Sequence, residues 1–363
     1  MKLKIEQVHK SYGAVHALRE TSLDVPAGEF LTLLGPSGSG KTTLLMILAG
    51  LGLPDGGRIW IDGKDATFAP VHARDIGMVF QNYALFPHLT VFENIAFPLR
   101  MRRLSERDIT AKVTRILEIV RLPQTAQRLP RELSGGQQQR IALARCAVYE
   151  PSIILMDEPL GALDKKLRDQ MQLEIKRLHV ELGVTILYVT HDQEEAMAMS
   201  DRICLMNDGR IEQLGTPAQL YFKPRTSFVA DFLGGSNIIG AVVRARDADR
   251  CILNGPLAST IEASDDRATI QTGDAVHFMV RPEHLRILGP GEHADNVLQA
   301  TLEQTIMVGA VTRHYVRLAS GEPIGVTALT TGPIQTHKPG DTVRLGWPAD
   351  RTVVLADAPA GGQ

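Results

Sequence analysis

Length, composition and charge place the chain in a broad class. It has 363 residues, too many for one ordinary hydrophobic core, so about two domains are expected. Hydrophobic residues make up 44% and charged residues 22% of it, as in a globular protein that folds in water. The 39 Lys and Arg residues are offset by 41 Asp and Glu residues, so no overall basic field points to nucleic acid as a partner.

The apolar runs are too short to cross a membrane. None approaches the ~20 residues that a membrane-spanning helix needs. Met1–Ile5 alternates like a strand and lacks the apolar core of a signal peptide. We therefore expect a cytoplasmic protein whose contact with any membrane is made through a partner.

Up to about Leu233, strand-like and helix-like segments alternate. This order is typical of an α/β layer fold with a largely parallel sheet. From about residue 88 to 150 strand character is scarce, and Ser105–Leu122 has the apolar spacing of a helix, which predicts a helical subdomain inserted into the α/β core. Met206–Ile211 places an Asp-Gly turn between two strand-like segments and predicts a hairpin. The strand candidates are Phe30–Leu34, Ile76–Phe80, Ile153–Met156, Thr185–Thr190 and Arg202–Met206.

The run Gly35–Thr43 has the pattern of a phosphate-binding loop, with its glycines, lysine and threonine in every fixed position. An apolar strand candidate precedes it, and Thr43–Ala49 follows as a predicted helix that Gly50 ends. Glycines let backbone N–H groups converge on phosphates, and the helix N-terminus adds the positive end of its dipole. We therefore predict that a nucleoside triphosphate is bound by Gly35, Pro36, Ser37, Gly38, Ser39, Gly40, Lys41, Thr42 and Thr43.

Two adjacent carboxylates end the strand candidate Ile153–Met156. Alone, such a pair is as often a solvated strand end as a site. Together with the phosphate loop, Asp157 suits the Mg²⁺ shell and Glu158 suits a general base that deprotonates the attacking water. The hydroxyl of Thr42 is the second predicted Mg²⁺ ligand.

A second glycine motif, Leu133–Arg140, reads LSGGQQQR. Its Gly-Gly pair opens a predicted helix that Ser134 caps, so it forms a second surface suited to anions. With this motif, the chain resembles the ATP-binding subunit of ABC transporters, for which LSGGQ is the signature. The resemblance implies a head-to-tail dimer of two copies with two ATP molecules at its interface, and with Ser134, Gly135, Gly136 and Gln137 facing the nucleotide held by the other copy.

Further positions of that family have counterparts here. Tyr12 resembles the aromatic residue that stacks on adenine, although a lone tyrosine is more often a core residue. Gln81 resembles the Q-loop glutamine that meets Mg²⁺ and the attacking water, and Asp164 resembles the D-loop aspartate that crosses the dimer interface. His191 resembles the switch histidine that contacts the γ-phosphate, although a histidine after a strand is usually a surface residue. Tyr83–Leu89, between Gln81 and the helical insert, is the expected contact with a membrane subunit, ordinary packing being the alternative.

The character of the chain changes at Gly234–Asn237, after which short β-branched runs alternate with Gly, Pro and Asp turns. This predicts an all-β barrel or sandwich. Thr272–Val276 resembles Pro339–Val343, and each is followed by a proline a few residues later, which is either a weak internal repeat or a coincidence of common turn residues. We expect an ATPase domain over 1–233, a β domain over 238–355 and a disordered tail over 356–363.

The resemblance extends to a group of importers. The runs MDEPLGALDKKLR and VTHDQEEAMAMSDR are similar to ATPases of spermidine/putrescine and related importers. Val280–Glu283 resembles a phrase of the C-terminal TOBE-type (OB-like) β extensions of polyamine, iron(III), sulfate, molybdate and maltose-type importers. The likeness implies two membrane permease subunits, an indirect link to a solute-binding protein and a place at the cytoplasmic face of the membrane. Polyamine is the leading solute, with iron(III), a phosphonate or a sugar as alternatives. A soluble ABC ATPase that acts on DNA or ribosomes is less favoured, because neither a heptad insert nor a second phosphate loop is present.

Overall fold

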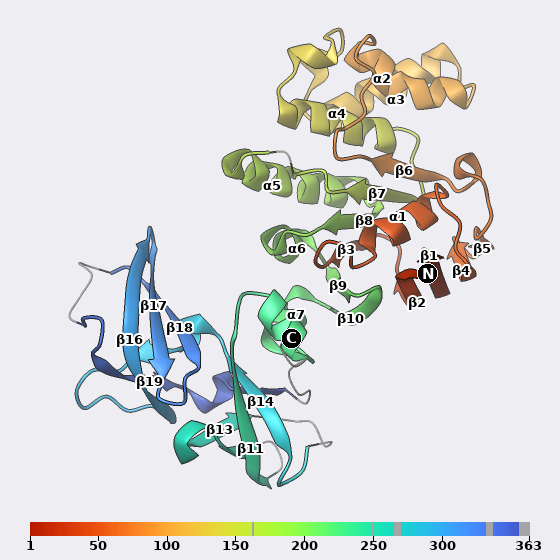
Figure 1. The fold of residues 1–363 in the computed structure, drawn as a ribbon. Coiled ribbons are helices and arrows are strands. Elements are labelled where there is room, and N and C mark those ends of the chain that lie inside the picture. The colour runs from red at the N-terminus through yellow and green to blue at the C-terminus, as the bar shows by residue number, and fades with distance from the viewer. Residues whose placement is uncertain (162, 248–249, 265–269, 332–336, 356–363) are drawn as a thin grey trace. The chain divides into compact units, whose positions relative to one another are not determined.

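The computed structural model describes residues 1–161, 163–247, 250–264, 270–331 and 337–355 (Figure 1). They form two compact units, Met1–Pro217 and Ala218–Gln363. The expected disordered tail, 356–363, lies outside the described residues, as does Ala162. None of the helices in the described parts combines the length and apolar character needed to cross a lipid bilayer.

The first unit is built on a six-stranded sheet, in the order β10-β9-β3-β8-β7-β6 (Figure 1). Its five strands from β9 to β6 run parallel, and β10 joins antiparallel through the Asp208-Gly209 turn. This confirms the predicted α/β class, the five predicted strands and the hairpin, with ends shifted by one residue at most. The strands are β3 (Phe30–Leu34), β6 (Ile76–Val79), β7 (Ile153–Asp157), β8 (Thr185–Thr190), β9 (Arg202–Asn207) and β10 (Arg210–Gly215).

Both faces of this sheet are buried, which explains the nearly continuous apolar runs. Alternate residues of a strand point to opposite faces, so Phe30 joins one hydrophobic core and Leu31 the other. The first core packs on α5 (Lys165–Leu182), and the second on α1 (Lys41–Ala49). The short helix α6 (Gln193–Met199) follows β8.

A second, antiparallel sheet of the first unit has the order β2-β1-β4-β5. Only its first strand was expected from the sequence. Its strands are β1 (Leu3–Tyr12), β2 (Val15–Val25), β4 (Gly56–Ile61) and β5 (Lys64–Asp65), and a 3₁₀ turn, η1 (Val71–Ala73), leads to β6.

The predicted helical insert is present as a group of three helices. Each begins with a hydroxyl residue that accepts a backbone N–H of the first turn: Thr90, Ser105 and Ser134. The helices lie together in Figure 1, and two 3₁₀ turns connect the second to the third. These elements are α2 (Val91–Met101), α3 (Glu106–Ile119), η2 (Pro123–Thr125), η3 (Pro130–Glu132) and α4 (Gly135–Ala147).

The second unit starts with α7 (Pro217–Phe222) and α8 (Ser227–Phe232) and continues as two β layers. One layer is a closed barrel, β11-β12-β13-β20-β14, and the other is a sheet, β15-β19-β16-β17-β18. Their elements are β11 (Asn237–Asp247), β12 (Arg250–Asn254), η4 (Pro256–Ala258), β13 (Thr260–Ser264), β14 (Ala275–Val280), η5 (Pro282–His284), β15 (Arg286–Ile287), β16 (Asn296–Val308), β17 (Val311–Leu318), β18 (Pro323–Leu329), β19 (Thr342–Trp347), η6 (Ala349–Arg351) and β20 (Val353–Leu355).

The second unit begins earlier than the boundary expected after Leu233. Arg281 follows β14 and is almost fully buried. Its guanidinium donates to the carbonyl oxygens of Ala230 and Leu233 at the end of α8, and to that of Tyr221 in α7 at 2.7 Å. These bonds tie both short helices to the β domain, a long-range link that a local change in composition does not reveal.

The weak repeat has a structural counterpart. In each copy a glycine with φ of 96° (Gly273 or Gly340) starts a turn before a six-residue strand, and a short 3₁₀ turn follows that strand. The strands are β14 and β19, one in each layer of the β domain.

Candidate nucleotide-binding site

The phosphate loop links β3 to α1, and two of its glycines have no room for a side chain. A Cβ atom on Gly35 would lie 2.2 Å from the carbonyl oxygen of Met206, and one on Gly40 would lie 2.6 Å from that of Ala17. Gly40 also has φ of 96°, a backbone conformation that favours glycine. The loop is thus held by close backbone contacts with the neighbouring chain segments.

The N-terminus of α1 has no cap from a side chain. Gly40 occupies the capping position, and no acidic residue lies in the first turn. The first N–H groups of a helix have no partner within the helix, so this end is suited to an anion. The structure therefore offers backbone donors at the position where the sequence predicts phosphate binding.

Lys41 lies folded over its own loop. Its Nζ donates to the carbonyl oxygens of Gly35 and Pro36 at 2.8 Å each, and the side chain is almost fully buried. Burial lowers the pKa of Lys41, while the charges of Glu158 and Asp157 oppose that shift. The loop thus holds its cation on neutral carbonyl groups, and a phosphate oxygen would be a stronger partner for it.

An open cavity of about 560 Å³ lies over the loop. This volume is within the range of small-molecule sites. The exposed Thr42 lies on its wall, whereas the exposed Tyr12 at the end of β1 is not among the residues that line it. The lining residues are Ala14, Val15, His16, Ala17, Arg19, Gly38, Ser39, Gly40, Lys41, Thr42, Thr43 and Asp208.

Six of these lining residues were not predicted. They are Ala14, the residues Val15, His16, Ala17 and Arg19 of β2, and Asp208 of the β9–β10 turn. No local motif marks them. A backbone bond from Arg19 N–H to the carbonyl of Gly209 at 2.8 Å places β2 beside that turn. This part of the wall depends on tertiary contacts between distant segments.

The two predicted carboxylates lie at the carboxyl end of the parallel sheet. Asp157 is the last residue of β7 and pairs in register with Val189 of β8, while Thr190 pairs with Leu34 of β3. Burial raises the pKa of Asp157, as does the charge of Glu158, and Lys41 opposes the rise. The sheet thus brings Asp157 and Glu158 close enough to Lys41 for their charges to interact.

Glu158 and His191 contact each other directly. His191 Nδ1 lies 3.1 Å from Glu158 Oε1, and the His191 side chain is 59% exposed. Glu158 has φ of 43°, and its N–H donates to the carbonyl of Val189 at 3.0 Å. The structure therefore places the predicted base beside the predicted switch histidine, at the ends of neighbouring strands.

Gln81 and Asp164 lie on the loops that flank this cluster. Gln81 follows β6, and a Cβ atom on Gly161 would lie 3.5 Å from its Nε2. Asp164 is exposed and caps α5 by accepting the N–H of Leu167 at 3.0 Å. Gln81 thus lies beside the loop after Glu158, and Asp164 lies at that loop's outer end.

The signature segment lies elsewhere in the first unit. Ser134 caps α4 by accepting the N–H of Gln137 at 3.4 Å, and the Gln137 side chain accepts the N–H of Ser134 at 3.0 Å. Gly136 is buried, and a Cβ atom there would lie 3.0 Å from Met171 Sδ of α5. Among the described residues, none from Ser134 to Gln137 lines the cavity over the phosphate loop.

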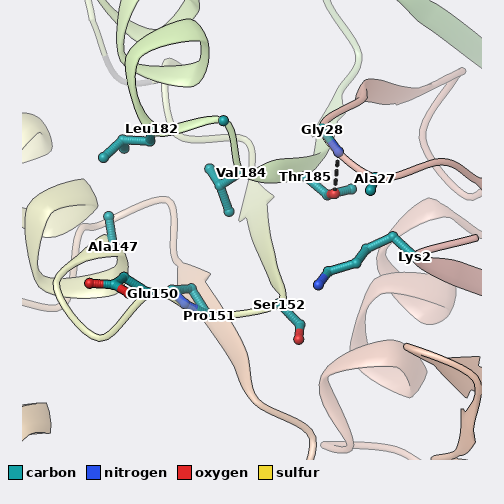
Figure 2. A pocket seen from close by; sticks show the side chains of 11 residues that line it. Lys2, Ala27, Gly28, Ala147, Glu150, Pro151, Ser152, Leu182, Val184 and Thr185 are labelled. Atoms are coloured by element: carbon teal, nitrogen blue, oxygen red, sulfur yellow. Dashed lines mark hydrogen bonds between the residues drawn. The ribbon is translucent and has the colours of Figure 1, made fainter.

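A second, smaller cavity, of about 190 Å³, opens at the amino ends of β7 and β8 (Figure 2). Its charged and hydroxyl groups bind within the chain. Lys2 and Ser152 both bind Asp62, Glu150 pairs with Lys112, and Thr185 accepts the N–H of Gly28, as Figure 2 shows. This cavity therefore differs from the open phosphate loop, where the N-terminus of α1 has no side-chain cap.

Known proteins are similar to this chain over nearly its whole length. Residues 18–161 match the ABC transporter family and residues 278–355 match the TOBE domain. The spermidine/putrescine import ATP-binding protein PotA of Acidothermus cellulolyticus is 46% identical over 96% of this chain and 90% of its own length. The protein of that name from Rubrobacter xylanophilus is 42% identical over 97% of this chain and 93% of its own.

Two solved structures resemble the first unit in size and fold. One is cbiO1 from Clostridium perfringens, part of the ABC transporter complex cbiONQ, with a TM-score of 0.57 and 29% identity over 60% of this chain and 89% of its own. The other is the ATP-binding cassette MJ0796, a dimer in a post-hydrolysis state bound to ADP and Pi, with a TM-score of 0.52 and 35% identity over 59% of this chain and 98% of its own. Because relatives at 42% and 46% identity span nearly its whole length, this chain belongs to the ATP-binding subunits of ABC transporters and carries a TOBE domain.

Proposed function

We propose that this protein hydrolyses ATP to power the import of spermidine, putrescine or a related polyamine. One observation carries the proposal: several relatives at 42–46% identity over nearly the whole chain are named as spermidine/putrescine import ATP-binding proteins. The phosphate loop, the carboxylates and the histidine supply the chemistry that such a subunit needs. The iron(III), phosphonate and sugar alternatives have no such support.

ATP is placed with its phosphates on the loop Gly35–Thr43 and on the N-terminus of α1. Lys41 exchanges its carbonyl partners for phosphate oxygens, and Tyr12 stacks on the base. Glu158 is the general base, and His191, whose Nδ1 lies 3.1 Å from Glu158 Oε1, is the residue beside it that contacts the γ-phosphate. The role of Tyr12 is assigned from the family pattern alone, and the other roles are assigned from that pattern and the geometry of the residues.

Mg²⁺ would be held by the hydroxyl of Thr42, the side-chain oxygen of Gln81 and the carboxylate of Asp157. Such a hard-oxygen donor set fits Mg²⁺. The burial that raises the pKa of Asp157 also favours a cation beside it, since a bound cation stabilises the charged carboxylate. Bound Mg²⁺ would neutralise charge on the phosphates.

A second copy of the chain is proposed to complete each site. Ser134, Gly135, Gly136 and Gln137 do not line the cavity of their own phosphate loop, although their motif suits a phosphate. A head-to-tail dimer would bring them over the nucleotide of the partner copy, with Asp164 at the interface. The dimeric MJ0796 structure provides a precedent for such an assembly.

The proposed transporter also contains two permease subunits, with the solute-binding protein as an indirect partner. The chain then lies at the cytoplasmic face of the membrane. Its docking surface is Tyr83–Leu89, where Phe86 is half-buried and Pro87 and His88 are exposed. The guanidinium of Arg145 supports this segment by donating to the carbonyl oxygens of Tyr83 and Ala84 at 3.0 and 2.8 Å.

Uptake in source cells tests the proposal. The chromosomal copy is replaced by the wild-type sequence, by Glu158→Gln or by the control Glu181→Gln, and uptake of labelled spermidine, putrescine, iron(III) and maltose is measured. We expect Glu158→Gln alone to abolish polyamine uptake and to leave the other solutes unaffected. Loss of iron or sugar uptake instead would overturn the polyamine assignment, and unchanged uptake of all four would overturn the importer role for these solutes.

A further inference from the structure

Arg168, on the first turn of α5, joins two loops of the candidate site. Its Nη1 lies 3.0 Å from Asp192 Oδ2, just after His191. Its Nη2 donates to the carbonyl of Leu163 at 3.1 Å, just before Asp164. One rigid guanidinium therefore links the segment that carries Asp164 to the segment that carries His191.

The link reaches the backbone around His191. Asp192 uses its other oxygen, Oδ1, to accept the N–H groups of Glu194 and Glu195 at 2.8 and 3.2 Å, which caps α6. The N–H of Asp192 donates to Thr190 Oγ1 at 3.0 Å. Since these bonds bracket His191, a displacement of Asp192 is expected to displace the histidine as well.

A third acceptor lies just out of reach of Arg168. Its Nε is buried and has no hydrogen-bond partner among the described residues, and it lies 3.8 Å from Glu195 Oε1. Glu195 is buried, and its other oxygen accepts from Tyr188 and Thr190 at 2.7 and 2.8 Å. An unpaired donor facing a buried carboxylate leaves room for a second arrangement, in which a small shift of Arg168 adds a charge-assisted bond.

We propose that Arg168 is a positioning residue for hydrolysis, which transmits the position of the Leu163–Asp164 segment to His191 through Asp192. This inference rests on the proposed function, because the displacement is expected where Asp164 meets the partner copy. Arg168 touches no reacting atom, so its effect should fall on turnover and on His191, and not on ATP affinity.

Arg177 of the same helix is the matched control. It pairs with Glu174 at 2.9 Å and with Glu181 at 2.6 Å, and it donates to the carbonyl of Ile119 at 3.0 Å. Like Arg168, it therefore binds carboxylate and backbone carbonyl groups, but it contacts neither site loop.

Turnover and ATP affinity are measured for wild type, Arg168→Met, Arg168→Lys and Arg177→Met. We expect Arg168→Met to lower kcat by about tenfold or more with ATP affinity changed less than about twofold, because only an indirect contribution to the transition state is lost. Arg168→Lys should have a kcat between those of Arg168→Met and wild type. Its ammonium group keeps the positive charge but lacks the planar arrangement of donors that binds two groups at once. Arg177→Met should keep wild-type kcat.

A double-mutant cycle tests whether the effect passes through Asp192. Asp192→Asn keeps an oxygen that can cap α6 but removes the charge that pairs with Arg168. If the residues act together, Arg168→Met should add little to the kcat loss of Asp192→Asn, whereas Arg177→Met and Asp192→Asn should be additive. Additive losses in the Arg168 cycle would overturn the proposal.

A measurement on His191 separates this inference from the proposed function. In histidine-labelled protein, the ring resonance that disappears in His191→Asn is followed by NMR without ATP. Arg168→Met should shift this resonance, and Arg177→Met should leave it in place. An unshifted resonance with normal turnover would refute the inference alone, whereas an inactive wild type with a shifted resonance would refute the ATPase function and retain the link.

Discussion

The two helices that begin at glycine motifs, α1 and α4, differ in how their first turns are satisfied. Gly40 leaves α1 without a side-chain cap, and Lys41 rests on loop carbonyls. At α4, Ser134 and Gln137 form a reciprocal capping box. Their glycines also differ in what they contact, because Gly35 and Gly40 of the phosphate loop lie against neighbouring backbone, whereas Gly136 lies against the Met171 side chain.

This difference indicates separate roles in binding. The N-terminus of α1 has backbone N–H groups without a side-chain cap, and Lys41 beside it is bound to neutral groups. This end can therefore bind phosphate without a second copy of the chain. At the N-terminus of α4, the capping box binds the backbone N–H groups of Ser134 and Gln137 without a ligand. This end can therefore be stable in a single copy of the chain. This comparison supports the proposal of a primary nucleotide site on α1 and an accessory surface on α4.

The largest effect is expected from Lys41→Ala. It removes a lysine that lines the cavity over the phosphate loop and with it the charge-assisted bonds to phosphate. We expect ATP affinity to fall by about 100-fold or more, since such bonds are worth roughly 1.5–3 kcal/mol each. Calorimetric titration measures this, with Lys112→Ala of the exposed pair with Glu150 as the control. Unchanged affinity would remove α1 as the primary site.

Glu158→Gln should act on turnover and not on binding. It keeps the size of the side chain but removes the base, so kcat should fall by about 100-fold or more, in the range of general-base contributions. ATP should then hold the dimer closed, which size-exclusion chromatography with light scattering detects. If light scattering gives the molar mass of one copy at saturating ATP, this result contradicts the proposal that α4 of one copy contacts the nucleotide bound at α1 of another.

Ser134→Ala tests the α4 side, with Ser105→Ala as a matched control. Both serines cap a helix of the same subdomain, with distances of 3.4 and 3.2 Å to the bonded N–H. Each variant should lose about 1 kcal/mol of unfolding free energy. Only Ser134→Ala should also lower kcat, by about tenfold, with ATP affinity intact. Equal rates in both variants would reduce Ser134 to a structural cap.

The smallest effect concerns the unliganded α1 site. Because the pKa of Asp157 is raised above its ordinary 3.8, the native state holds this proton more tightly than the unfolded chain. The tighter binding of this proton adds to the free energy of unfolding below pH 3.8. This addition is lost as pH rises from 3.8 through the raised pKa of Asp157 in the native state. Asp157→Asn lacks this dependence, so its stability relative to wild type should increase over that pH window. The midpoints of urea unfolding of both proteins, measured across this pH window, give the difference in stability. If the two midpoints change with pH in the same way, Asp157 does not make stability depend on pH.

The sequence determined the local chemistry of this protein. Three features can be recognised from a few consecutive residues, because glycine conformation, apolar runs and helix caps depend on near neighbours in the sequence. They are the loop Gly35–Thr43, the strand before Asp157 and the cap of α4. The positions of five strands along the chain and the class of fold followed from the same patterns. The antiparallel sheet around β1 was less evident, because β1 also pairs with β4, which lies far from it in the sequence.

Only the tertiary structure decided how these pieces meet. The register of Leu34 with Thr190 and of Asp157 with Val189 places the site elements at one edge of the sheet. The cavity wall from β2, the link through Arg168 and the burial of Arg281 also depend on segments distant in sequence. Such contacts are set by packing and strand order, which no local pattern of residues encodes.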